Sequence, residues 1–155
     1  WSSDVCSSDL LVLWESYAIM QYLADLTPGQ TLYPAAAGER ADVNRWLFWC
    51  GQELMPGMSI LNWENSIKPM LGLGDPDPSE VARGTALFRA AAEILDQQLQ
   101  AREWLCASGL SLADLAIAAP LADLERARLP VAGLHHLARW FQQIQALPSW
   151  AEEQA

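Results

Sequence analysis

The stretch at residues 110–124 most strongly constrains what this chain folds into. Ser111 is followed three residues later by Asp114, which is the spacing of a capping box at a helix N-terminus, with Asp in place of the usual Glu. In such a box the serine oxygen accepts the Asp114 N–H and the carboxylate accepts the Ser111 N–H. Leu110 and Leu115 hold the positions of a hydrophobic staple. The residues behind them are apolar on almost every side, which is typical of a helix at the centre of a bundle.

Composition indicates one globular domain and excludes some classes of binding partner. Apolar residues make up 52% and charged residues 18% of 155 positions, enough for one core of ordinary size. Nineteen acidic against nine basic residues give a formal charge of −10, which disfavours nucleic acid and anionic membranes. No apolar run approaches the roughly 20 residues that span a bilayer. Three widely spaced cysteines favour free thiols in a reducing compartment, and we expect a cytoplasmic protein.

Residues 1–10 contain Ser-Ser-Asp twice and show no usable periodicity. They resemble a translated adapter sequence, and the alternative is a disordered tail. We therefore interpret residues 1–10 as a non-native or disordered leader and base no fold prediction on them.

A short apolar run at residues 10–13 has strand character and leads directly into a helix that begins near Ser16. The first N–H groups of that helix have no internal acceptor and carry the positive end of the helix dipole. They favour a carboxylate, and the Ser16 hydroxyl adds a donor. Glu15 beside them is suited to accept from an ammonium group. The alternative is that Ser16 is only a cap and Glu15 a solvated acid, and the residues alone favour that alternative.

The chain from residue 39 onward is predicted to be helical. Apolar residues recur at helical spacing in four segments: residues 39–54 with a continuation at 58–67, 80–100, 111–124 and 134–147. We expect Pro56 to break or kink the first segment and Ser79 to cap the second. Residues 28–38 are rich in turn formers and form a linker. His135 and His136 are adjacent and diverge on a helix, so we expect no metal site.

Five stretches in a fixed order together resemble the glutathione S-transferase family. They are Trp14-Glu15-Ser16-Tyr17-Ala18-Ile19 with Tyr22-Leu23, Leu32-Tyr33-Pro34, Arg40-Ala41 with Trp46-Leu47 and Trp49, Trp104-Leu105 with Leu110-Ser111-Leu112-Ala113-Asp114, and Trp140 with Ile144 and Ala146-Leu147-Pro148-Ser149-Trp150. The resemblance implies an all-α fold, a helical bundle of the glutathione transferase C-terminal domain type, preceded by a short strand–helix remnant of a thioredoxin-like α/β domain. It assigns residues 11–27 to the remnant, 28–38 to the linker and 39–155 to the all-helical domain.

The resemblance also implies a function, the transfer of glutathione to hydrophobic electrophiles in the complete protein. It assigns Glu15 and Ser16 to the γ-glutamyl end of glutathione, which carries both an ammonium and a carboxylate. It places Trp49, Glu53 and Met58 on the helix that walls the cleft for the hydrophobic co-substrate. Glutathione and a small electrophile are the implied ligands, and the full-length protein is expected to be a homodimer.

The capping-box pair, Ser111 and Asp114, is assigned to folding and not to chemistry. In the family, the residue that activates the glutathione thiol lies in the thioredoxin-like half expected before residue 11, so no catalytic residue is assigned in this chain. We therefore expect a truncated transferase that binds glutathione poorly and is inactive alone. Two alternatives remain: a glutathione-dependent disulfide reductase or dehalogenase of the same fold, and a non-catalytic protein-interaction module.

Overall fold

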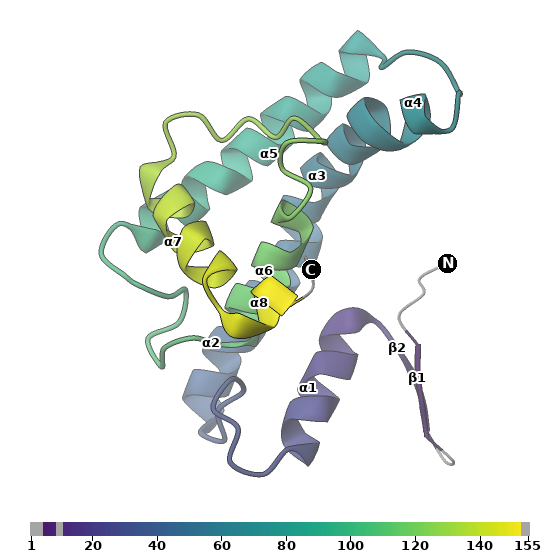
Figure 1. Cartoon of the computed structure of the whole chain (residues 1–155). Coiled ribbons are helices and arrows are strands. Elements are labelled where there is room, and N and C mark those ends of the chain that lie inside the picture. The colour runs from purple at the N-terminus through teal and green to yellow at the C-terminus, as the bar shows by residue number, and fades with distance from the viewer. Residues whose placement is uncertain (1–4, 9–10, 153–155) are drawn as a thin grey trace.

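The computed structural model describes the backbone of residues 5–8 and 11–152 and is mostly helical (Figure 1). The elements are β1 (Val5–Ser8), β2 (Leu11–Trp14), α1 (Ser16–Leu26), α2 (Ala37–Trp49), α3 (Met55–Asn62), α4 (Lys68–Met70), α5 (Pro78–Leu99), α6 (Leu112–Leu121), α7 (His135–Gln145) and α8 (Pro148–Glu152). Two π-helical turns, η1 (Cys50–Leu54) and η2 (Trp63–Ile67), join α2, α3 and α4 into one continuous helical path. The predicted all-helical bundle with a short strand–helix segment before it is confirmed.

The N-terminal segment forms a two-stranded hairpin that leads into α1. β1 pairs antiparallel with β2, from Val5 opposite Trp14 to Ser8 opposite Leu11. β2 matches the strand expected at residues 10–13, and α1 matches the helix expected after it. Residues 5–8, which the sequence analysis left out of the fold, are therefore part of this hairpin. Residues 1–4 and 9–10 of the proposed leader lie outside the described residues, and its non-native origin stays a prediction.

Helix α6 lies at the centre of the bundle, as predicted. Seven of its ten residues are buried: Leu112, Ala113, Asp114, Ala116, Ile117, Ala118 and Leu121. It packs against α1, α2 and α7. The helix ends at Leu121, directly after Pro120, whose missing N–H leaves the Ala116 carbonyl in the preceding turn without its helical donor.

The start of α6 forms the predicted capping box, and the box reaches further than its two residues. Asp114 Oδ2 accepts the Ser111 N–H at 3.0 Å and the Ser111 hydroxyl at 2.9 Å. Asp114 Oδ1 accepts the Leu105 N–H at 3.0 Å and the Trp140 Nε1–H at 2.9 Å. Burial raises the pKa of Asp114 above its ordinary value, although the hydrogen bonds oppose this by favouring the carboxylate. One buried carboxylate thus ties α6 to the segment before it and to α7.

Helices α3 and α5 approach each other closely through two glycines. A Cβ atom on Gly57 would lie 2.4 Å from the backbone nitrogen of Phe88. A Cβ atom on Gly84 would lie 2.8 Å from Cγ2 of Ile60. Both distances are shorter than a van der Waals contact, so only glycine allows the two helices to approach this closely.

Two helix boundaries differ from the sequence-based expectation. The cap of α5 is Asp77, not Ser79: the Asp77 carboxylate accepts the Ser79 N–H at 2.8 Å. Pro78 then occupies the first turn of α5, where its missing N–H is no loss. We expected a break or kink at Pro56. The structure instead has the π-helical turn η1 just before it, and Pro56 lies in the first turn of α3.

Candidate functional site

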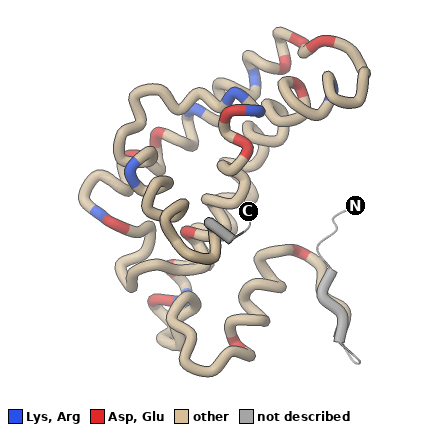
Figure 2. The backbone as a smooth tube through the Cα atoms, in the orientation of Figure 1, with Lys and Arg blue, Asp and Glu red and all other residues tan. Residues whose placement is uncertain are grey.

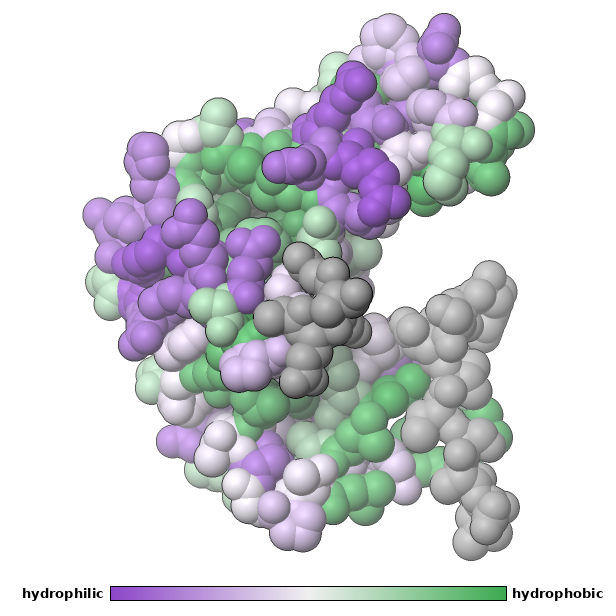
Figure 3. Space-filling model, in the orientation of Figure 1, coloured by the Kyte–Doolittle hydropathy of each residue, from purple (hydrophilic) through white to green (hydrophobic). Residues whose placement is uncertain are grey.

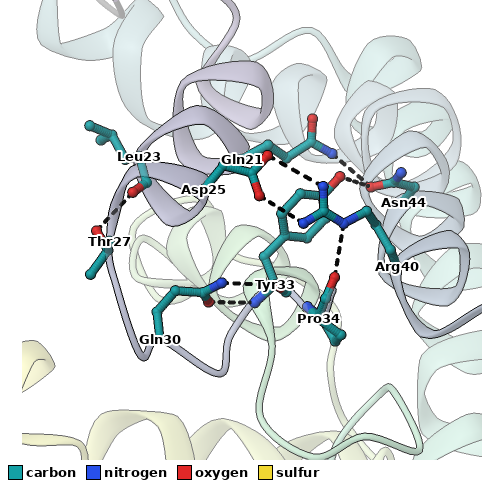
Figure 4. Close-up of polar contacts among 9 residues, drawn as sticks. All are labelled: Gln21, Leu23, Asp25, Thr27, Gln30, Tyr33, Pro34, Arg40 and Asn44. Atoms are coloured by element: carbon teal, nitrogen blue, oxygen red, sulfur yellow. Dashed lines mark hydrogen bonds and ion pairs between the residues drawn. The ribbon is translucent and has the colours of Figure 1, made fainter. Parts of the chain in front are cut away.

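Helix α1 is fixed against the helical domain by a polar network around the linker (Figure 4). The Tyr33 hydroxyl donates to Asn44 Oδ1 at 3.0 Å, and Gln21 Nε2 donates to the same oxygen at 2.7 Å. Arg40 lies over the Tyr33 ring, with Cζ 4.1 Å from the ring centroid, and pairs with Asp25 of α1 at 2.7 Å. These contacts join α1, the linker and α2, so the start of α1 keeps a defined position relative to α2.

The start of α1 has an unusual backbone conformation at Glu15. This residue has a φ of 74°, a value that residues other than glycine rarely adopt. Its carbonyl accepts the Ile19 N–H at 3.0 Å, which closes the first turn of the helix. Within the described residues, this helix start has no side-chain cap and no acidic residue in its first turn. The first N–H groups of α1, from Ser16 onward, are therefore available to an anionic ligand.

Two cavities of similar size open on either side of the first turn of α1. The α6 cavity, of about 510 Å³, lies between α1, α3, α6 and the chain end; it is lined by Ser16, Tyr17, Met20, Met55, Leu115, Ala116, Ala119, Pro120, Ser149 and Trp150. The α2 cavity, of about 550 Å³, lies between α1, α2 and η1; it is lined by Glu15, Tyr17, Ala18, Gln21, Leu47, Phe48, Gly51 and Gln52. Tyr17 borders both cavities, while Ser16 faces the first and Glu15 the second.

The α6 cavity is an apolar space. Its lining contains no Asp, Glu, Lys or Arg, and its two hydroxyl groups other than Tyr17 come from Ser16 and Ser149. Figure 2 shows charged residues towards the two ends of α1 and uncharged residues between them. Figure 3 shows apolar surface along α1 in the same view. A ligand in this cavity would therefore be held by apolar contact, with polar groups only near the helix start.

The residues predicted to line the co-substrate cleft are not brought together. Met58 is buried and lines a smaller cavity of about 100 Å³ that also includes Met55 and Pro120. Trp49 packs edge-on against Trp46 with 5.2 Å between ring centroids, and Glu53 is exposed on η1. Neither Trp49 nor Glu53 belongs to the lining of the α6 or α2 cavity. Their role in the cleft stays a prediction.

Sequence reasoning missed the residues that do shape the space beside α1. Tyr17 borders both cavities, and Met20, Met55 and Trp150 line the α6 cavity. Tyr17 had a local signal, because it directly follows the serine of the predicted site. The other three come together only through tertiary packing of α1, α3 and the chain end, for which the sequence offers no local pattern.

Comparison with known proteins identifies the family of this chain. The model of the glutathione S-transferase C-terminal domain matches residues 60–148, which is more than half of the chain. The chain belongs to this family. It is 29% identical over 146 residues to glutathione S-transferase GstB of Escherichia coli K12, covering 90% of the chain and 65% of that relative. It is 26% identical over 140 residues to FtsZ-localized protein A of Caulobacter vibrioides, covering 89% of the chain and 61% of that relative.

The solved structures agree with this membership of the glutathione S-transferase family. Glutathione S-transferase III in its apo form superposes with a TM-score of 0.82 at 28% identity, covering 96% of the chain and 69% of that structure. The chain covers less than two thirds of the length of the two curated relatives named above. Among the described residues, none of the helices combines the length and the apolar character needed to cross a bilayer.

Proposed function

We propose that this chain is part of a glutathione transferase and that the start of α1 binds the γ-glutamyl end of glutathione. The Ser16 hydroxyl and the first N–H groups of α1 bind the ligand's α-carboxylate, and the Glu15 carboxylate accepts from its ammonium group. The observation that carries this proposal is the positive φ of Glu15 at an uncapped helix start. Such strain costs on the order of 1–3 kcal/mol and tends to cluster at binding sites. Membership of a glutathione transferase family supports glutathione as the ligand.

In this proposal the hydrophobic electrophile occupies the α6 cavity. Ser16 lines that cavity, so a glutathione whose γ-glutamyl end is held at the start of α1 can extend its thiol towards the apolar interior. Met58 approaches from the neighbouring small cavity, whereas Trp49 and Glu53 remain candidates from the family resemblance alone. We propose no catalytic residue in this chain and expect a thioredoxin-like half of the complete protein to activate the thiol. The 155-residue chain is then expected to bind glutathione weakly and to conjugate none. Cytoplasmic location and homodimerisation of the complete protein belong to the same proposal.

A titration of the isotope-labelled chain with glutathione, followed by amide chemical shifts, tests this assignment. We expect shift changes at Ser16, Tyr17 and Ala18, and none when Cys-Gly, which lacks the γ-glutamyl group, replaces glutathione. S16A and E15Q should each weaken binding about tenfold to 100-fold, the value of one hydrogen bond to a charged group.

The matched control is E39Q, which removes an acid from the first turn of α2 without touching α1. It should leave glutathione affinity unchanged. Shift changes confined to another part of the chain, or equal effects of E39Q and E15Q, would contradict the assignment of glutathione to the start of α1.

A protein-interaction module is the second candidate function. The similarity to FtsZ-localized protein A favours it, as do three exposed apolar side chains around the end of α4, Met70, Leu71 and Leu73. Gel filtration of the chain alone and with candidate partners would separate this candidate from a transferase. A disulfide reductase or dehalogenase of the same fold would use the same contacts at α1, and assays of the complete protein with disulfide, halide and electrophile substrates distinguish these reactions.

A further inference from the structure

An apolar cavity that the proposed function leaves unused lies between α7 and the segment that follows α6. This cavity, the α7 cavity, has a volume of about 260 Å³. Most of its wall is formed by apolar side chains from the two elements: Leu121, Leu124, Val131, Leu137 and Phe141. Figure 3 shows apolar surface in this gap, with hydrophilic surface around it. Such a lining offers water few hydrogen-bonding partners, so an apolar group displaces water from it favourably.

Two features of the sequence keep the α7 cavity open. After α6 ends at Leu121, the chain continues in turns and not as a helix. On α7, Ala138 lies one turn before Phe141 and Gln142 and has the shortest side chain of the residues that line the cavity. A longer side chain at position 138 would therefore take up part of the space beside Phe141.

The aromatic wall of the α7 cavity is held in place by its neighbours. The Phe141 ring meets the Trp150 ring edge-on, with 5.8 Å between centroids, and its centroid lies 6.5 Å from that of Trp140. Trp140 is itself fully buried and donates to Asp114 at 2.9 Å. The wall thus needs little reorganisation to accept a ligand, which lowers the free-energy penalty of binding.

A larger and more polar cavity adjoins the α7 cavity. This turn cavity has a volume of about 560 Å³ and includes the turn at residues 122–126. It shares lining residues from both sides of the gap with the α7 cavity: Leu121, Leu124, Phe141 and Gln145. Its ionisable residues are Asp123, Glu125 and Arg126. Arg126 pairs with Asp123 at 2.7 Å, and among the described residues no ion pair involves Glu125. The turn cavity therefore has one net negative charge, and the formal charge of −10 on the chain adds to its attraction for cations.

We propose that these two cavities together bind an amphipathic amine, with its apolar body in the α7 cavity and its ammonium group in the turn cavity near Glu125. An apolar cavity of about 150 Å³ holds benzene, so the α7 cavity is large enough for one aromatic ring with a short chain. Gln145 borders both cavities, and its side-chain oxygen is an acceptor for the ammonium group.

This amine site is separate from the site at the start of α1. Neither the α7 cavity nor the turn cavity shares a lining residue with the α6 cavity or the α2 cavity. Binding of an amine beside α7 therefore does not depend on whether glutathione binds to Glu15 and Ser16, and the two proposals can fail independently.

Titration of the isotope-labelled chain with 4-phenylbutylamine, followed by amide chemical shifts, tests the amine site. We expect shift changes at Leu124, Ala138 and Gln145, with a dissociation constant on the order of 1 mM for a ligand of this size. The uncharged 4-phenylbutanol should bind about twofold to fivefold more weakly, and 4-phenylbutyrate more weakly still, because an exposed charge pair has a modest value. Shift changes centred on Ser16 and Ala119, or no shift changes, would overturn the proposal.

The variant A138F tests the apolar part of the amine site. Ala138 is exposed, so the variant should keep the far-ultraviolet circular dichroism spectrum of the wild type. Its ring should fill the α7 cavity and weaken the binding of 4-phenylbutylamine about tenfold or more. The matched control is A82F, which places the same ring on the exposed surface of α5 and should bind the amine as the wild type does. Equal affinities of A138F and the wild type would contradict the assignment of the apolar body to the α7 cavity.

The variant E125Q tests the charged part of the amine site. It should remove the difference in affinity between 4-phenylbutylamine and 4-phenylbutanol, and it should leave the affinity for the alcohol unchanged. The matched control is E103Q, which removes an exposed acid outside both cavities and should preserve the difference. A wild type that binds the amine no more tightly than the alcohol, or binds 4-phenylbutyrate more tightly than the amine, would reject an amine as the ligand.

Discussion

Replacing Asp114 by alanine should be among the most destabilising single changes in the chain. The carboxylate accepts four hydrogen bonds, from Ser111 N–H and Oγ–H, Leu105 N–H and Trp140 Nε1–H. In D114A the two amides and the indole are left without this acceptor in a buried site, at about 1 kcal/mol or more each. Removing a buried charge offsets part of this loss. We therefore expect D114A to lower the free energy of unfolding by about 3–5 kcal/mol, against a total of about 5–15 kcal/mol for a domain.

Urea unfolding followed by far-ultraviolet circular dichroism measures this loss without depending on the fluorescence of Trp140. S111A, which keeps the Ser111 N–H, should cost less, about 1–2 kcal/mol. The matched control is D123A, which removes a partly exposed carboxylate paired with Arg126 just beyond α6 and should change stability by less than about 0.5 kcal/mol. A loss below about 1 kcal/mol in D114A would refute the reasoning, because it would mean that the three donors find other acceptors.

The pH dependence of stability tests the same carboxylate in a second way. Burial raises the pKa of Asp114 in the folded state, while an unfolded aspartate has a pKa of about 3.9. The folded state therefore binds the Asp114 proton more tightly than the unfolded state does. Protonation of Asp114 thus stabilises the fold: the contribution is fully present below about pH 3.9 and is lost as pH rises through the folded pKa. D114N does not titrate, so the stability of the wild type relative to D114N should fall over this window. A relative stability that rises with pH would show that the hydrogen bonds outweigh burial.

Three further predictions concern packing, thiol reactivity and a helix end. G57A should lower the free energy of unfolding by about 3 kcal/mol because its Cβ meets the backbone of α5. G84A should lose less, about 1 kcal/mol, because its Cβ meets only side-chain atoms, those of Ile60 and Leu61; similar thermal shifts would contradict this. Burial raises the pKa of Cys106 to about 11, so in a C6S background native protein should react slowly with a disulfide reagent at about pH 8; fast reaction before unfolding would contradict this. D96A removes the acceptor of two N–H groups in the first turn of α7 and should lower the free energy of unfolding in urea by about 1–2 kcal/mol. An unchanged free energy of unfolding would contradict the capping role of Asp96.

The central helix was predictable because its signals are local. Ser111 and Asp114 are three residues apart, and the apolar run behind them is continuous, so both the cap and the burial of α6 follow from neighbouring residues. The partners of the other carboxylate oxygen were not predictable. Leu105 and Trp140 reach Asp114 through the fold of the segment before α6 and through the packing of α7.

The candidate site was predictable only where it follows the chain directly. Glu15 and Ser16 were found from a strand that runs into a helix and from the family resemblance, whereas Met20, Met55 and Trp150 reach the α6 cavity through the packing of separate helices. The expected cleft residues, Trp49, Glu53 and Met58, came from the family resemblance alone, which says nothing of the local helix geometry in this chain. The π turn η1 carries an extra residue, so the residues at its far end face differently from a regular 3.6-residue helix. Met55 thereby lines the α6 cavity, while Glu53 is exposed.

Intermolecular nuclear Overhauser effects from S-hexylglutathione test the central claim most directly, because this ligand carries both a γ-glutamyl group and an apolar tail. The account predicts contacts from the γ-glutamyl protons to Ser16 and from the hexyl chain to Ala119 and Trp150 in the α6 cavity. Contacts of the hexyl chain with Phe48 and Gln52 in the α2 cavity, or a γ-glutamyl group bound away from α1, would contradict it.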